Sequence, residues 1–89
     1  MKVDIKSFAH LRLALGQSLM TVDVPDGSTV ADLMGVLTNH FGEAARTAIW
    51  TKDGQNLKVT PVVDGKAVDL QMPLRDGMMV VFMSIVAAG

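Results

Sequence analysis

The sequence predicts an α+β domain in which a mixed sheet of about four to five strands packs on one main helix. Segments with strand-like alternation lie near both ends of the chain, and one segment with helical spacing lies between them. Asp-Gly pairs separate most of the segments, as expected for tight turns. Because one amphipathic helix covers only one face of a sheet, we expect a single sheet folded around that helix.

The first part of the chain predicts two strands. Residues 3–9 begin with alternating apolar and charged side chains, the period of two that is typical of a strand. Residues 19–24 alternate in the same way. Between them, residues 11–15 are apolar and Gly16 begins a turn signal. We therefore expect an antiparallel hairpin whose strands are joined by a short loop.

A helix is predicted after the Pro-Asp-Gly segment 25–27. Ser28 or Thr29 can act as its N-cap, and Asp32 lies in the first turn, where the helix dipole favours negative charge. Gly42 is a suitable C-cap. The residues that recur at helical spacing on one face are Val30, Leu33, Met34, Leu37 and Phe41.

The second half of the chain predicts further strands. Residues 43–50 are ambiguous and allow a short second helical turn. In the apolar segment 57–63, Pro61 indicates an edge position or an irregular strand. The expected turns are Asp64-Gly65, which leads into a short strand 67–70, and Asp76-Gly77, which leads into the final strand. With the final strand beside the first, near the middle of the sheet, this order is the β-grasp, or ubiquitin-like, arrangement.

The final strand is apolar on both of its faces. One alternating set is Met78, Val80 and Phe82, and the other is Met79, Val81 and Met83. The helix can bury only one set, and the sequence does not decide which. The other set is expected on an open sheet face, where contiguous apolar surface usually binds a partner and methionine adapts to it. The alternative is that the variable segment after the helix covers this face.

The predicted partner-binding residues are Phe8, Met78, Val80, Phe82 and Arg75. Arg75 is placed among them because it lies directly before the final strand. Together with Asp76 it is also typical of a charged turn, and we favour that turn.

The composition excludes several function classes. The net charge of −1 provides no basic surface for nucleic acid or an anionic membrane. The chain has no cysteine, which removes disulfides and thiolate chemistry and fits a cytoplasmic protein. His10 and His40 lie in different segments without carboxylates at metal-ligand spacing, so no metal site is predicted. Neither a nucleophile motif nor a phosphate-binding loop is present, and we do not expect an enzyme.

The C-terminal segment 84–89 is small and uncharged and ends in Gly89. We expect a globular domain over residues 1–83 and a flexible tail over residues 84–89. A frayed terminus explains such a tail. A slim tail after a buried strand also suits a terminal carboxylate that takes part in a reaction.

Over essentially its whole length the chain resembles the MoaD/ThiS family of small sulfur-carrier proteins, and it is most similar to the longer MoaD-like members. The resemblance rests on several motifs in a shared order. These are Phe8-Ala9-His10-Leu11-Arg12 followed by Gly16, Pro25 to Leu33, Val62-Val63-Asp64-Gly65-Lys66, Pro73-Leu74-Arg75-Asp76-Gly77, and the terminal Val86-Ala87-Ala88-Gly89.

This resemblance implies that the Gly89 carboxylate is the reactive group. In such carriers a ubiquitin-activating-like adenylyltransferase of the MoeB/ThiF type adenylates the terminal glycine, using ATP and Mg²⁺. The resulting thiocarboxylate donates sulfur inside the large subunit of molybdopterin synthase, of the MoaE type, during molybdenum or tungsten cofactor assembly. By the same resemblance Val86, Ala87 and Ala88 form the segment that threads into the partner, and the carrier itself binds no cofactor.

Ala88 departs from the family pattern, which has glycine at this position. Forcing an alanine into a left-handed conformation costs roughly 1–2 kcal/mol, so the methyl group would slow transfer in a channel that requires that conformation. The alternative function is therefore a non-catalytic β-grasp interaction module whose Ala-Gly tail is disabled. A ThiS-like thiamin sulfur carrier is a further alternative, and ubiquitin-like conjugation to lysines ranks after it.

Overall fold

The computed structural model describes residues 1–84. They form a mixed sheet of five strands with helices packed against it. In chain order the elements are β1 (Lys2–Ser7), α1 (Ala9–Leu15), β2 (Leu19–Asp23), α2 (Val30–Phe41), α3 (Glu43–Ile49), β3 (Val59–Val63), β4 (Lys66–Ala67) and β5 (Met79–Ser84).

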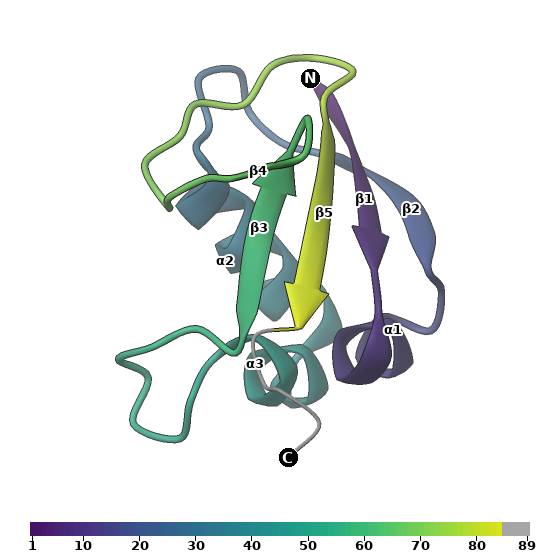
Figure 1. Ribbon diagram of the computed structural model, residues 1–89. Helices are drawn as coiled ribbons and strands as arrows, with labels where there is room; N and C mark the ends of the chain where they lie inside the picture. The colour runs from purple at the N-terminus through teal and green to yellow at the C-terminus, as the bar shows by residue number, and fades with distance from the viewer. Residues whose placement is uncertain (85–89) are drawn as a thin grey trace.

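The sheet has the strand order β2-β1-β5-β3-β4. β1 pairs in antiparallel orientation with β2 and in parallel orientation with β5, and β3 is antiparallel to both β5 and β4. Helix α2 crosses one face of this sheet, while none of the helices within residues 1–84 covers the opposite face (Figure 1). The predicted α+β fold is confirmed, including the place of the final strand beside the first.

Helix α2 begins with a capping box. The Thr29 hydroxyl accepts a hydrogen bond from the Asp32 amide at 3.3 Å, and the Asp32 carboxylate accepts one from the Thr29 amide at 2.9 Å. These bonds satisfy two backbone donors near the helix N-terminus. At the other end, the Gly42 amide donates to the Thr38 carbonyl at 2.8 Å. Both predicted caps are confirmed, with Thr29 rather than Ser28 at the N-cap.

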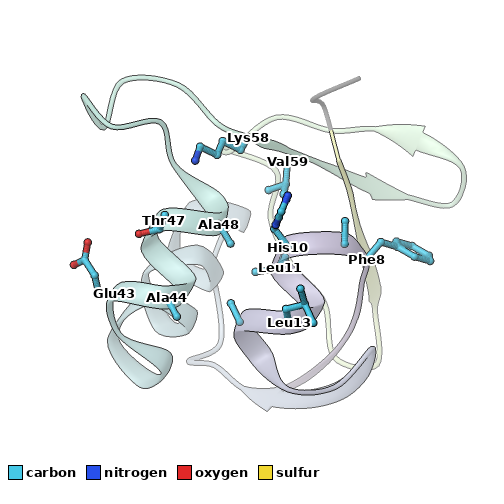
Figure 2. A pocket seen from close by; sticks show the side chains of 12 residues that line it. Phe8, His10, Leu11, Leu13, Glu43, Ala44, Thr47, Ala48, Lys58 and Val59 are labelled. Atoms are coloured by element: carbon cyan, nitrogen blue, oxygen red, sulfur yellow. The ribbon is translucent and has the colours of Figure 1, made fainter. Parts of the chain in front are cut away.

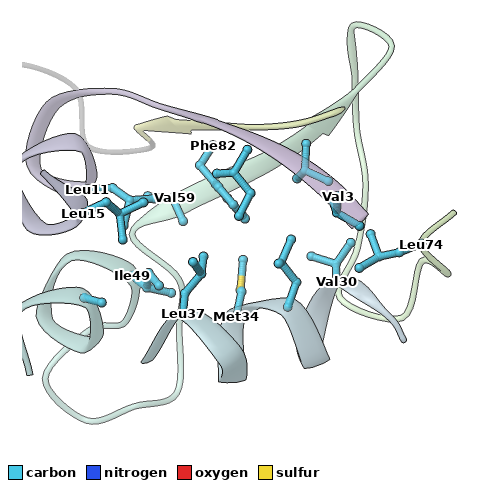
Figure 3. Packing of buried hydrophobic residues seen from close by; sticks show 14 of the residues in the cluster. Val3, Leu11, Leu15, Val30, Met34, Leu37, Ile49, Val59, Leu74 and Phe82 are labelled. Atoms are coloured by element: carbon cyan, nitrogen blue, oxygen red, sulfur yellow. The ribbon is translucent and has the colours of Figure 1, made fainter. Parts of the chain in front are cut away.

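The apolar face of α2 packs against the inner face of the sheet. In Figure 3, Phe82 points from β5 toward the helix, where Met34 and Leu37 point back toward the sheet. All three side chains are fully buried. The core also includes Val3, Ile5, Val30, Leu33, Ile49 and Val80.

Residues 11–15 form most of helix α1 and not the expected loop. Leu11 and Leu15, one helical turn apart, are both buried and attach α1 to the core. Gly16 ends the helix with φ 80° and donates its amide hydrogen to the Arg12 carbonyl. β1 and β2 are antiparallel neighbours as predicted, but a helix connects them.

The segment after α2 forms α3, so its helical interpretation is confirmed. α1 and α3 pack side by side at the end of the sheet where β1 and β5 finish (Figure 1). β4 is shorter than the predicted strand 67–70 and begins one residue earlier.

Pro61 lies within β3, between β5 and β4, and not on the edge of the sheet. Its carbonyl accepts a hydrogen bond from the Val68 amide at 2.9 Å, on the β4 side. In an antiparallel pair the nitrogen and carbonyl of one residue face the same neighbour. The proline nitrogen therefore faces away from β5, and the pairing of β3 with β5 loses no bond.

Candidate functional site

The face of the sheet opposite α2 carries apolar side chains from several strands. Met79 and Val81 of β5 lie in register with Asp4 and Lys6 of β1, so they point to the outer face, away from the buried Val3 and Ile5. On the other side of β5, Val81 lies opposite Val62, and Met83 lies opposite Thr60. We call Phe8, Val62, Met79, Val81 and Met83 the open-face patch.

The largest side chains of the patch are well exposed. The exposed fractions are 40% for Phe8, 38% for Met79 and 45% for Met83. The ammonium of Lys6 lies 5.6 Å from the centroid of the Phe8 ring, which places this ring beside the β1 side of the patch. Exposed apolar side chains on neighbouring strands are typical of a protein-binding surface.

Polar groups border the patch along β1 and β2. Thr21 donates a hydrogen bond to Asp4 at 2.6 Å, and Lys2 forms an ion pair with Asp23 at 3.6 Å. Both pairs bridge the two strands on the outer face. An apolar centre with a charged border is the usual anatomy of a protein interface.

The prediction that Met78, Val80 and Phe82 lie at the exposed surface is wrong. Their exposed fractions are 8%, 0% and 1%. In the parallel pairing, Val80 lies opposite Ile5 and Phe82 lies opposite Ser7, both on the inner face of β1. These side chains therefore pack toward α2, and the alternate set of β5 residues occupies the outer face.

Phe8 is exposed and belongs to the open-face patch, and its contact with a partner stays a prediction. Arg75 is exposed in the turn that precedes β5, and its carbonyl accepts a hydrogen bond from the Met78 amide at 3.0 Å. The favoured interpretation of Arg75-Asp76 as a charged turn is confirmed. A contact between Arg75 and a partner stays a prediction.

The predicted reactive and threading residues lie beyond the described part of the chain. They are Gly89 and the preceding Val86, Ala87 and Ala88. Ser84, predicted to belong to the tail, is instead the last residue of β5 and of the described part of the chain. This end of β5 lies at the same end of the sheet as α1 and α3 (Figure 1).

The remaining polar residues form local surface interactions. A hydrogen bond from Arg46 lowers the pKa of the exposed Glu43 carboxyl, and one from the Thr51 hydroxyl lowers the pKa of Asp53. Within residues 1–84, no three histidine or carboxylate side chains lie together as metal ligands would. None of the helices described here has the length and hydrophobicity needed to cross a membrane.

The acidic residues near the start of α2 have structural roles. Asp32 completes the capping box, Asp23 pairs with Lys2, and Asp26 lies 3.3 Å from the N-terminal ammonium. The two histidines lie on separate helices: His40 contacts Phe41 edge-on, with the ring centroids 4.8 Å apart, and His10 lies on α1.

No protein-family model matches this chain, and no curated protein matches it by sequence. Solved structures do match it. SAMP1 from Haloferax volcanii is 24% identical, the alignment covers 100% of both chains, and the TM-score is 0.83. A putative molybdopterin converting factor subunit 1 from Pyrococcus furiosus is 25% identical, with 97% of this chain and 99% of that chain covered and a TM-score of 0.79.

A further match is the complex of subunits 1 and 2 of the molybdopterin-converting factor from Helicobacter pylori. It is 17% identical, with 100% of both chains covered and a TM-score of 0.63. These matches extend over nearly the whole described sheet and its helices. The fold of this chain is therefore the ubiquitin-like β-grasp of the MoaD/ThiS-type proteins.

Proposed function

We propose that this protein is a MoaD-like sulfur carrier that serves molybdenum or tungsten cofactor assembly. Its fold, shared with proteins that include molybdopterin converting factor subunits, supports a carrier role. The main support for the proposal is the open-face patch, which lies largely on β5. The segment that ends at Gly89 follows this strand directly. A partner that binds the patch would therefore lie close to the residues that carry the Gly89 carboxylate.

In the proposed reaction the protein is a co-substrate and not an enzyme. The Gly89 carboxylate attacks the α-phosphate of ATP in a MoeB/ThiF-type adenylyltransferase that supplies Mg²⁺, and pyrophosphate leaves. Hydrosulfide from the sulfur donor then attacks the acyl adenylate, AMP leaves, and the chain carries a thiocarboxylate. The thiocarboxylate sulfur attacks a precursor bound by a MoaE-type large subunit, and water hydrolyses the resulting acyl–sulfur bond, which leaves the sulfur on the precursor and restores the Gly89 carboxylate.

The proposed partners are thus the adenylyltransferase and the large subunit, and the proposed location is the cytoplasm, where ATP is available. The complex of subunits 1 and 2 from Helicobacter pylori supports the second partner, since its subunits assemble with each other. The open-face patch supplies an apolar surface for such an assembly, and the Lys2–Asp23 ion pair and the Thr21–Asp4 hydrogen bond supply a polar border.

The test measures the intact mass of the protein after incubation with ATP, a sulfur donor and the adenylyltransferase from the same genome. We expect the wild type to exchange one oxygen for sulfur at Gly89. Ala88→Gly should react up to about tenfold faster, because removing a penalty near 1.4 kcal/mol from the transition state changes a rate tenfold. Absence of exchange in both proteins contradicts the proposal.

Ala88 favours a second candidate function. An alanine next to the terminal glycine adds a methyl group and restricts the backbone. If only Ala88→Gly exchanges oxygen for sulfur, the native chain is a β-grasp interaction module that has the docking surface and lacks an activatable terminus. A thiamin-pathway carrier would show exchange in the wild type but would not bind the molybdopterin synthase large subunit.

A further inference from the structure

Two hollows lie outside the open-face patch. The larger is a groove of about 650 Å³ between α1 and α3. Figure 2 shows Leu13 of α1 along one side of it and Ala44 and Ala48 of α3 along the other. Val59, which also lines the groove, pairs with Ser84 at the end of β5. The groove therefore belongs to the surroundings of the candidate site.

The smaller hollow lies between strand β2 and helix α2, and its volume is about 240 Å³. We call it the β2 cleft. It is lined by half-buried apolar side chains from both elements, which are Met20, Val22, Val36 and Phe41. β2 is the edge of the described sheet on this side (Figure 1). An apolar cleft beside a sheet edge suits an added strand, whose backbone pairs with the edge while alternate side chains enter the cleft.

Three residues of β2 present their backbone groups at this edge. The Ser7 amide donates a hydrogen bond to the Ser18 carbonyl at 2.8 Å. In an antiparallel pair of strands, hydrogen-bonded and non-hydrogen-bonded pairs alternate, so every second residue after Ser18 directs its backbone groups toward β1. The residues between them, Leu19, Thr21 and Asp23, direct their amides and carbonyls away from β1. Within residues 1–84, no strand pairs with this side of β2.

The two edges of the sheet differ in how they resist further pairing. β4, at the opposite edge, has only two residues, and one of them is the exposed Lys66. Short length and lysine are both common means of protecting a sheet edge. β2 has five residues, which include neither lysine nor proline. Of the two edges, β2 is therefore the one that accepts another strand.

We propose that β2 pairs with β2 of a second copy of this chain, in antiparallel orientation about a two-fold axis at Thr21. The Thr21 residues of the two copies then form a hydrogen-bonded pair, and Leu19 of each copy forms another with Asp23 of the other copy. Because Leu19 and Asp23 lie symmetrically about Thr21, all three residues satisfy their outward backbone groups. A two-fold dimer requires such a self-complementary surface.

The side chains also match in this register. On the outer face, Asp23 of the second copy lies opposite the uncharged Leu19, and the next residue in the same row is Lys6 of β1. Lys6 forms no ion pair within residues 1–84. Its backbone lies two strand spacings, about 10 Å, from that of the aspartate, a gap that the two side chains together span. On the inner face, Met20 lies opposite Val22 of the second copy, so apolar side chains meet beside the two β2 clefts.

This dimer leaves the open-face patch uncovered, because strands that pair edge to edge do not cover either face of the sheet. The inference therefore goes beyond the proposed carrier function and does not depend on it. A protein that dimerises but gains no sulfur would leave the inference intact and refute only the carrier function.

Cysteine cross-linking tests the register of the dimer. The chain has no cysteine, so Thr21→Cys permits only a disulfide between two copies. The Cα atoms of a hydrogen-bonded antiparallel pair lie about 5.5 Å apart, and disulfides join Cα atoms about 4.4–6.8 Å apart. We expect Thr21→Cys to form a covalent dimer under mild oxidation and Ala67→Cys, exposed on the opposite edge strand β4, to remain monomeric. Equal cross-linking of the two variants, or none in Thr21→Cys, overturns the proposal.

Sedimentation equilibrium measures the dimer without a cross-link. We expect the full-length wild type to reach twice the mass of one chain as its concentration rises. Thr21→Pro should raise the dimer Kd at least about tenfold, because each dimer loses two hydrogen bonds. The β1–β2 pairing loses none, since the Thr21 amide faces the open edge.

Ala67→Pro is the matched control on β4. The amide of the next residue, Val68, is bonded to β3, so the Ala67 amide faces away from β3. This variant should leave the Kd unchanged. A Kd that does not respond to Thr21→Pro, or responds equally to both prolines, overturns the proposal. So does a wild type that is monomeric at every concentration, which would leave β2 to an extended segment of another protein.

Discussion

Neighbouring residues of β5 have opposite environments. Phe82 is 1% exposed and Met83 is 45% exposed. Alternation along a strand produces this contrast, because successive side chains point to opposite faces of the sheet. Phe82 should therefore contribute to stability through burial, whereas Met83 remains available to a partner.

Replacing each residue by alanine should separate these roles. We expect Phe82→Ala to lower the free energy of unfolding by about 3–5 kcal/mol, the cost of removing a large buried aromatic side chain. Met83→Ala should change it by no more than about 0.5 kcal/mol, as is usual for surface positions. Chemical denaturation of both variants measures the difference. Equal losses would show that the faces of β5 are assigned incorrectly.

The turns and helices of this fold use glycine for different reasons. Asp64 and Gly65 join β3 to β4 with positive φ angles of 52° and 78°. This combination is the type I′ turn, which suits the twist of a hairpin. Gly35 lies inside α2, where no positive φ is required, and a Cβ atom added there would meet nothing within 4 Å.

Glycine-to-alanine substitutions at these two positions should have opposite signs. Gly65→Ala should destabilise the protein by roughly 1–2 kcal/mol, because alanine is strained at a left-handed position. Gly35→Ala should stabilise it by roughly 0.5–1 kcal/mol, because alanine loses less conformational entropy in a helix. Thermal unfolding of the two variants provides the comparison, and a loss of stability in Gly35→Ala would contradict the proposed packing of α2.

Helix α1 does more than connect β1 to β2. It packs next to α3, and residues of both helices line the groove between them. A plain loop at residues 11–15 would leave α3 without this neighbour. Helix α1, which was predicted as a loop, is thus one of the two helices that form the groove.

At the scale of the whole molecule, two apolar surfaces meet near the end of β5. The open-face patch covers the outer side of the sheet, and the groove lies between the helices at the end of the sheet. Phe8 belongs to the patch and also lines the groove. A partner seated on the patch would therefore lie close to the segment that follows β5.

Charge placed on the patch should weaken the proposed complex with the large subunit. We expect Met83→Glu to raise the Kd at least about tenfold, equivalent to 1.4 kcal/mol, because it buries an unpaired carboxylate in the interface. Ala31→Glu adds the same charge on α2, away from the outer face, and should leave the Kd unchanged. Calorimetric titration measures both, and equal affinities for the two variants would exclude the patch as the docking surface.

Local signals in the sequence were sufficient for much of the fold. The cap at Thr29, the helical spacing up to Phe41 and the Asp64-Gly65 turn each depend on a few neighbouring residues, and each was predicted. Residues 11–15 were missed because the segment is a short helix, too brief for its two buried leucines to establish a period. The signal that could have revealed it is the spacing of Leu11 and Leu15 followed by Gly16.

The sequence by itself determined the mixed β-grasp sheet, the main helix and the presence of an apolar set on the outer face of the last strand. Only the tertiary structure decided that Met79, Val81 and Met83 form that set and that Met78, Val80 and Phe82 are buried. The physical reason is that both sets are equally apolar, so nothing within the strand distinguishes them. The parallel register with β1, a contact between distant parts of the chain, assigns each residue to its face.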